Sequence, residues 1–146
     1  MQDLKRQATM GRFSVEFVIS NHRDVVAAEL GNIPPDQVRR ATLQGLVDTG
    51  ATYLVLPAAV VKQLGLPRTS RMKVRYADGR QATRDVVSEV QVDMLGRQGT
   101  FRAVVEPKRQ EALIGAIVLE DLDLLPDCTN RRLVPRDPNI MLGEIE

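Results

Sequence analysis

Residues 46–52 read LVDTGAT: an apolar run ends on a carboxylate, and a turn follows at once. The segment VRRATLQGLVD (38–48) predicts a β-strand that runs into Asp48, and YLVLP (53–57) predicts a second short strand. In the turn between them, Gly50 is expected to supply a positive φ or a close approach of two backbones. The sequence therefore predicts an acidic side chain held between two buried strands.

Short strands separated by turns make up most of the remaining chain. FSVEFVI (13–19) alternates apolar and polar residues, as a half-buried strand does. MKVRYADGRQATRDVV (72–87) has the alternation and the Asp-Gly pair of a β-hairpin. SEVQVDML (88–95) and GTFRAVVEP (99–107) predict two more strands, and DLLPDCTNRRLVP (123–135) predicts a closing hairpin. Many short strands at close spacing indicate a barrel or a sandwich.

Short helices are expected beside these strands. AAVVKQL (58–64) follows a proline and precedes Gly65, which predicts a helix with a glycine C-cap. Residues 118–122 predict a further helical turn, whereas residues 25–30 fit a strand or a helix equally well. The predicted fold class is thus mostly β, with one or two short helices.

The length of 146 residues predicts one domain, over residues 11–146. Residues 1–10 are polar and aperiodic, which predicts a flexible N-terminal tail, and Met10 is a second candidate start. Aromatic residues make up 3% of the chain and tryptophan is absent, so the core is expected to consist of Val, Leu, Ile and Ala.

Composition also excludes several classes of function. A net charge of +1 offers no general attraction to nucleic acid or to an anionic membrane. A single cysteine, Cys128, excludes an internal disulfide framework, and a single histidine, His22, excludes a His-rich metal site. The sequence has no segment that is long and apolar enough to span a bilayer and no signal-peptide pattern, so a cytoplasmic location is expected by default.

The remaining chemistry at Asp48 is that of paired carboxylates. A serine or cysteine nucleophile needs a neighbouring base, and His22 lies far from any candidate in the sequence. Hydrolysis by a metal needs a cluster of ligands that the sequence lacks, and no cofactor is expected. Two carboxylates ~4 Å apart in an effective dielectric of ~20 would repel by about 4 kcal/mol if both were ionised. Such a pair therefore shares one proton, and its two members serve as general base and general acid.

Three segments together resemble the retropepsin-like (clan AA) single-domain aspartic proteases. LVDTGATYLVLP (46–57) resembles the catalytic turn with its flanking strands. VRYADGRQATRDVVSEVQVDMLG (74–96) resembles the flap hairpin and the strand after it. ALIGAIVLEDLDLLPDCTNRRL (112–133) resembles the apolar-Gly segment, its helix and the last hairpin. Proton sharing between two aspartates is established for this class of enzyme, so that behaviour is taken from the family.

The resemblance implies a retropepsin-like acid-protease β-barrel and an aspartic endopeptidase. Because one chain carries one Asp-Thr-Gly, it also implies a homodimer in which two copies of Asp48 form the dyad. The implied ligand is a peptide or protein substrate, without nucleic acid, membrane, metal or cofactor. The implied catalytic residues are Asp48, Thr49 and Gly50, and the implied substrate-binding residues are Ala51, Thr52, Tyr76, Ala77, Asp78 and Gly79.

The chain departs from the viral pattern at several positions. Thr52 stands where viral enzymes place a second acid, and Ala116 stands where they place an arginine. Residues 20–40 are an insertion without a counterpart, and Gly115 is expected to let a helix approach the Asp48 turn closely. Two alternatives therefore remain: a catalytically weak or inactive dimeric module that binds peptides or regulates, and a structural β-domain. Tyr76 is likewise expected either as a flap contact or as an ordinary half-buried strand residue.

Overall fold

The computed structural model describes residues 12–146. The expectation of a flexible tail over residues 1–10, and the question of a start at Met10, lie outside these residues. Within residues 12–146, no helix is long and apolar enough to cross a membrane.

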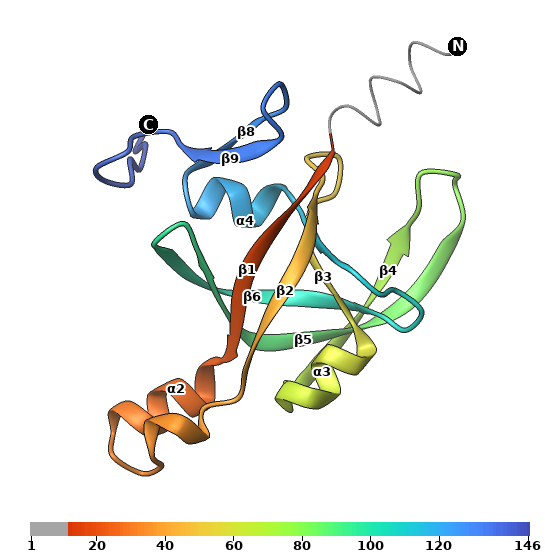
Figure 1. Ribbon diagram of the computed structural model, residues 1–146. Coiled ribbons are helices and arrows are strands. Elements are labelled where there is room, and N and C mark those ends of the chain that lie inside the picture. The colour runs from red at the N-terminus through yellow and green to blue at the C-terminus, as the bar shows by residue number, and fades with distance from the viewer. Residues whose placement is uncertain (1–11) are drawn as a thin grey trace.

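Six strands form a closed ring of hydrogen-bonded neighbours (Figure 1). In ring order they are β1 (Phe13–Asn21), β2 (Arg40–Val47), β7 (Ala112–Ile114), β3 (Leu54–Pro57), β6 (Arg97–Glu106) and β5 (Gln81–Met94). The pairing of β1 with β5 closes the ring. The predicted barrel is therefore confirmed, and closure leaves its strands without exposed edges.

Strand β4 (Arg68–Arg75) lies outside the ring and pairs with the first part of β5. The later part of β5, from Val90 to Asp93, pairs with β1 instead. Between the two parts, the register shifts at a bulge in which Glu89 has a φ of 62°. A bulge bends a strand and strengthens its twist. It therefore marks the point where the neighbour of β5 changes from β4 to β1, and the outer part of the β4–β5 hairpin projects away from the barrel (Figure 1).

Three short α-helices and one 3-10 helix accompany the strands described: α2 (His22–Glu29), η1 (Pro35–Gln37), α3 (Ala58–Leu64) and α4 (Ala116–Asp121). Helices α3 and α4 were expected, and Gly65 ends α3 in the left-handed conformation as predicted. Helix α2 settles the ambiguous segment, and it begins earlier than the sequence indicated. The Asn21 side chain explains the early start, because it caps the helix by accepting a hydrogen bond from the Asp24 amide at 3.2 Å.

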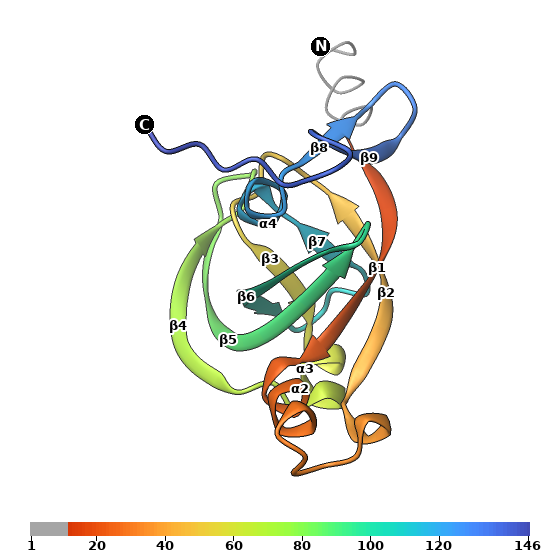
Figure 2. The same ribbon diagram turned by 90° about the vertical axis from the view of Figure 1, so that its left-hand side faces the viewer.

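The barrel interior contains the core. Its fully buried side chains include Ile19, Leu54, Leu56, Ile114 and Leu122. The expectation of an aliphatic core was incomplete, because all three phenylalanines are also buried in it: Phe13, Phe17 and Phe101. Above the barrel, β8 (Leu124–Asp127) and β9 (Arg132–Pro135) form the predicted closing hairpin, whereas α2 and α3 lie at the opposite end (Figure 2).

Candidate active site

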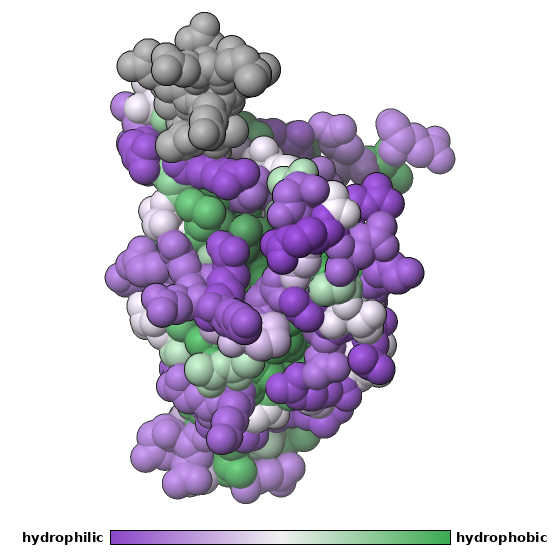
Figure 3. All heavy atoms as spheres, turned by 90° about the vertical axis from the view of Figure 1, so that its right-hand side faces the viewer, coloured by the Kyte–Doolittle hydropathy of each residue, from purple (hydrophilic) through white to green (hydrophobic). Residues whose placement is uncertain are grey.

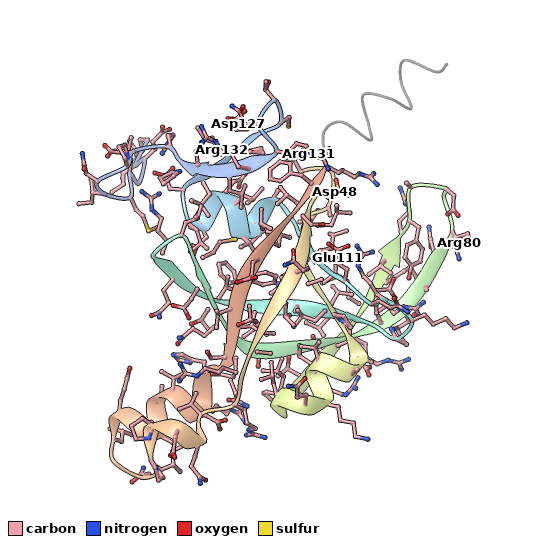
Figure 4. The ribbon with its side chains drawn as sticks, viewed as in Figure 1. Asp48, Arg80, Glu111, Asp127, Arg131 and Arg132 are labelled. Atoms are coloured by element: carbon pink, nitrogen blue, oxygen red, sulfur yellow. The ribbon has the colours of Figure 1, made fainter. Side chains whose placement is uncertain are left out.

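Asp48 immediately follows β2, at the end of the barrel opposite to α2 (Figure 4). Its amide donates a hydrogen bond to the Ile114 carbonyl at 3.0 Å, and its own carbonyl accepts one from the Ala51 amide at 3.1 Å. The carboxylate oxygen Oδ1 accepts a hydrogen bond from the Gly50 amide at 2.9 Å. These hydrogen bonds hold the carboxylate in a fixed direction. The side chain is 18% exposed, so it still reaches solvent.

The Asp48 turn is tied to the start of helix α4. The Ala116 amide donates to the Ala51 carbonyl at 2.8 Å, and the Ile117 amide donates to the Thr52 carbonyl at 3.0 Å. A Cβ atom at Gly115 would lie 2.5 Å from the Tyr53 carbonyl oxygen, a distance that real Cβ atoms do not show. The expected role of Gly115, close approach of the helix to the turn, is confirmed.

Gly50 has one of the two properties expected of it. It does not adopt a positive φ, contrary to the first expectation. A Cβ atom at this position would lie 3.2 Å from Asp48 Oδ1, so glycine permits the close approach of the amide to the carboxylate. The turn needs no left-handed residue because the Asp48 side chain and carbonyl close it.

A cleft of about 610 Å³ opens beside the turn. We call it the Asp48 cleft. Strand β4 and the base of the β4–β5 hairpin form one side of it, and Val55, Val104 and Leu113 of the barrel line it too. The predicted site residues that line it are Asp48, Gly50, Ala51, Thr52, Tyr76 and Ala77. The cleft lining does not include Thr49, Asp78 or Gly79.

The tip of the β4–β5 hairpin is a local structure. The Tyr76 amide donates to the Arg80 carbonyl at 2.8 Å, and the Gly79 amide donates to the Tyr76 carbonyl at 2.9 Å. Gly79 has a φ of 88°, which gives a three-residue loop of the type that ends on a left-handed glycine. Asp78 Oδ1 accepts a hydrogen bond from the Arg80 amide at 3.0 Å. In Figure 4, Arg80 lies on the outer part of the hairpin, away from Asp48.

The base of the hairpin is attached to the end of β6 through Tyr76. Its hydroxyl donates to Glu106 Oε2 at 2.7 Å, and Arg84 forms an ion pair with the other oxygen of Glu106. Burial and the hydrogen bond to Glu106 raise the pKa of Tyr76, so the hydroxyl remains a donor. Sequence reasoning missed Glu106 and Arg84, since no local pattern connects them to Tyr76.

Sequence reasoning also missed Arg12. Its Nε atom lies 3.6 Å from Asp48 Oδ2. A signal was present: antiparallel pairing of the predicted strands that begin at Phe13 and end at Val47 brings their outer neighbours together. Among the residues that the structure describes, the hydroxyls of Thr49 and Thr52 make no hydrogen bond, and no group of three or more His, Cys, Asp or Glu could hold a metal ion.

Comparisons with known proteins assign this part of the chain to a family. The family described as "gag-polyprotein putative aspartyl protease" matches residues 37–121, more than half of the chain. The matched range includes the Asp48 turn, the β4–β5 hairpin and Gly115. No curated protein sequence was found to match. Among solved structures, the chain is similar to EIAV protease complexed with the inhibitor HBY-793, with 25% identity and a TM-score of 0.45. The similarity covers 56% of this chain and 77% of that one.

Proposed function

The chain belongs to the "gag-polyprotein putative aspartyl protease" family, and we propose that it is an aspartic endopeptidase that acts as a homodimer. Membership confirms the resemblance to retropepsin-like proteases and supports a protease function. The dyad, the residues of the site and the peptide substrate belong to the proposal.

The observation that carries the proposal is the setting of Asp48. It lines an open cleft, and main-chain groups fix its turn. The other carboxylate that lines the cleft, Glu106, is already bonded to Tyr76 and Arg84. Within residues 12–146, the cleft therefore offers no second acid to pair with Asp48. A second copy of the chain would supply that acid, as a two-fold axis through the Asp48 turns would place the same residue opposite.

The proposed mechanism is general acid–base hydrolysis. One Asp48 is ionised and removes a proton from water, whose oxygen attacks the carbonyl carbon of the scissile peptide bond. The protonated Asp48 of the other copy gives its proton to the carbonyl oxygen. The tetrahedral gem-diol then collapses and the C–N bond breaks: the leaving nitrogen takes the proton from the first Asp48, and a gem-diol hydroxyl returns a proton to the second, so the dyad again holds one proton. The hydrogen bond from the Gly50 amide keeps the carboxylate oriented throughout.

The second candidate is a dimeric module that binds peptides with weak or no catalysis. The contact between Arg12 and Asp48 favours it, because Arg12 occupies the side of the carboxylate that a second Asp48 would have to approach. In a dyad that shares one proton, each Asp48 contacts the Asp48 of the other copy, and this contact replaces the one with Arg12. In the protease, Arg12 therefore has to turn away from Asp48 when two copies associate.

Cleavage of a peptide library at several pH values tests the proposal. We expect acid-favoured cleavage that pepstatin inhibits and that Asp48→Asn reduces by at least about 100-fold. Asp36→Asn is the matched control, since this exposed residue lies in η1, remote from the cleft. Sedimentation should show a dimer under the assay conditions.

Two results would reject the protease. Equal cleavage by the parent protein and Asp48→Asn would show that Asp48 is not catalytic, and a strict monomer with full activity would remove the dyad. Peptide binding without cleavage, by a dimer, would favour the second candidate.

A further inference from the structure

Positive charge gathers around the Asp48 cleft. The basic residues that line the cleft are Arg12, Lys73, Arg75 and Arg109. A second cavity of about 480 Å³ shares Tyr76, Glu106 and Arg109 with the cleft and adds Arg80, Arg84 and Lys108. We call this second cavity the basic pocket. The whole chain has a net charge of only +1, so composition alone does not explain this concentration.

Ion pairs neutralise only part of this charge. Arg12 is paired with Asp48, Arg84 with Glu106, and Arg80 with Asp78. Across the part of the chain that the structure describes, four of the lining cations have no carboxylate within salt-bridge distance: Lys73, Arg75, Lys108 and Arg109. Hydrophilic residues cover much of the face seen in Figure 3 and surround smaller apolar areas.

Lys73 and Arg75 lie at the rim of the cleft. Both are exposed, and they alternate along β4 with the half-buried Met72 and Val74. Since alternate residues of a strand point to opposite faces, these two cations flank the opening and do not fill it.

Arg109 occupies the junction of the two cavities and is oriented in advance. It is half-buried, and its Nε donates to the Glu111 carbonyl at 2.6 Å. Its amide donates to the Glu106 carbonyl at 3.3 Å, which fixes the loop that carries it. The two Nη groups make no hydrogen bond with any residue from 12 to 146. A guanidinium held at Nε loses little freedom when its other donors bind a carboxylate.

Building on the proposed function, we propose that the end of the Asp48 cleft that adjoins the basic pocket selects peptide substrates that carry Asp or Glu close to the scissile bond. Arg109 and Lys108 are the anchoring residues. An acidic side chain would enter the basic pocket, where it meets unpaired positive charge. A basic side chain at the same place would be repelled. The apolar residues Val55, Val104 and Leu113 would receive the neighbouring part of the peptide.

A binding experiment with Asp48→Asn tests this preference without requiring turnover. Three synthetic peptides share one apolar centre and are flanked on both sides by Glu, by Gln or by Lys. Fluorescence anisotropy should show the Glu peptide binding about threefold to tenfold more tightly than the Gln peptide, and the Lys peptide binding most weakly. Salt at about 0.3 M should reduce this difference, since the charges are partly exposed.

Charge reversal on the same background locates the preference. Asp48→Asn/Arg109→Glu and Asp48→Asn/Lys108→Glu should lose or invert the order of the three peptides. Asp48→Asn/Arg23→Glu should keep it, because Arg23 is exposed on α2 at the far end of the barrel. Unchanged thermal melting of each variant shows that the fold is intact. The double variant Asp48→Asn/Arg109→Lys keeps the charge but not the planar fork and should retain part of the preference.

Equal binding of the Glu and Gln peptides, no binding of any of the three, or an order that survives Arg109→Glu would overturn the inference. These results are separate from failure of the proposed function. Cleavage by the parent protein without preference for Glu would reject only the acidic substrate class. Preference for Glu in a protein that never cleaves would reject only the protease.

Discussion

The turn that carries Asp48 lines the cleft on one side, and the β4–β5 hairpin lines it on the other with its base; the turn and the tip of the hairpin are held in opposite ways. Main-chain bonds from Ile114, Ala116 and Ile117, which come from a distant part of the sequence, fix the turn. Apart from the bond between the Tyr76 hydroxyl and Glu106, the hydrogen bonds of the tip run among residues 76–80. Tertiary structure therefore fixes the position of the acid, whereas the tip is a local structure that can open by itself.

This difference fits a site that needs one rigid and one adjustable side. Catalysis requires the reacting groups in fixed positions, because small displacements of a catalytic group are costly. Entry of a peptide requires the covering segment to move. Tyr76 takes part in both the fixed and the adjustable side. Its hydroxyl bonds the base of the hairpin to Glu106, and its backbone begins the loop at the tip.

The largest effect is expected from Gly115→Ala. The added methyl group would meet backbone atoms of Ala51, Thr52 and Tyr53 within 2.8 Å, and backbone cannot rotate aside. We expect the free energy of unfolding to fall by about 3 kcal/mol and cleavage to be lost with it. Urea denaturation followed by circular dichroism measures the change.

Gly79→Ala is the control at the hairpin tip. Nothing lies within 4 Å of its added Cβ, so only the φ of 88° opposes the substitution. The cost should be about 1 kcal/mol and should be confined to the tip. Equal losses at the two glycines would contradict the distinction between a turn fixed by tertiary contacts and a local tip.

Tyr76→Phe is expected to have a smaller effect. It removes the hydroxyl that donates to Glu106 and leaves the ion pair between Glu106 and Arg84 in place. The loss of one hydrogen bond to a partly buried carboxylate should cost about 1 kcal/mol of unfolding free energy. The hairpin should also become more mobile, so KM should rise more than kcat falls.

Tyr53→Phe provides the matched control. Tyr53 is the only other tyrosine of the chain and also lines the cleft, but its hydroxyl makes no hydrogen bond to residues 12–146. Its replacement should leave stability nearly unchanged. If both substitutions cost the same, the bond to Glu106 does not hold the hairpin.

Structures held by neighbouring residues, such as the β4–β5 hairpin and the cap of α3, could be predicted from the sequence. Alternation over residues 72–87 and the Asp78-Gly79 pair predicted the hairpin, and a glycine after an apolar helix predicted the cap at Gly65. These features depend on neighbours in the chain, whose preferences a sequence records directly. The structure adds the length of the loop, which has three residues and ends on Gly79.

The contacts of the Asp48 turn with distant parts of the sequence could be predicted only at Gly115, where a glycine indicated close packing. Gly115 was expected to allow close approach, and the contacts with Tyr53 and Ala51 agree. Glu106 gave no such signal, because a charged residue at a strand end is ordinary in any surface turn, and the signal for Arg12 lay only in the pairing of two predicted strands. Their partners are set by strand register and by the folding of the hairpin over β6, which follow from the closed barrel as a whole.

Acidification should have the smallest effect on stability, and it should loosen the hairpin tip without loosening the Asp48 turn. The hydrogen bonds from the Arg80 amide and side chain hold the pKa of Asp78 below its usual value. A lowered pKa means that this contribution is fully present above the unfolded value of about 3.9 and is lost as the pH falls through the folded value. Below about pH 4, the tip should therefore loosen progressively.

The Arg80 amide reports this change, and the Ala116 amide is the reference within the same protein. Proton exchange of Arg80, corrected for the intrinsic rate, should accelerate in acid, whereas Ala116 donates to the Ala51 carbonyl, which does not titrate in this range. Asp78→Asn keeps an acceptor oxygen and should remove the pH dependence. If Ala116 loosened in parallel with Arg80, the tip would not move independently of the turn. A dyad that shares one proton is expected to work in acid, so a tip that loosens there would ease peptide entry while the Asp48 turn stays in place.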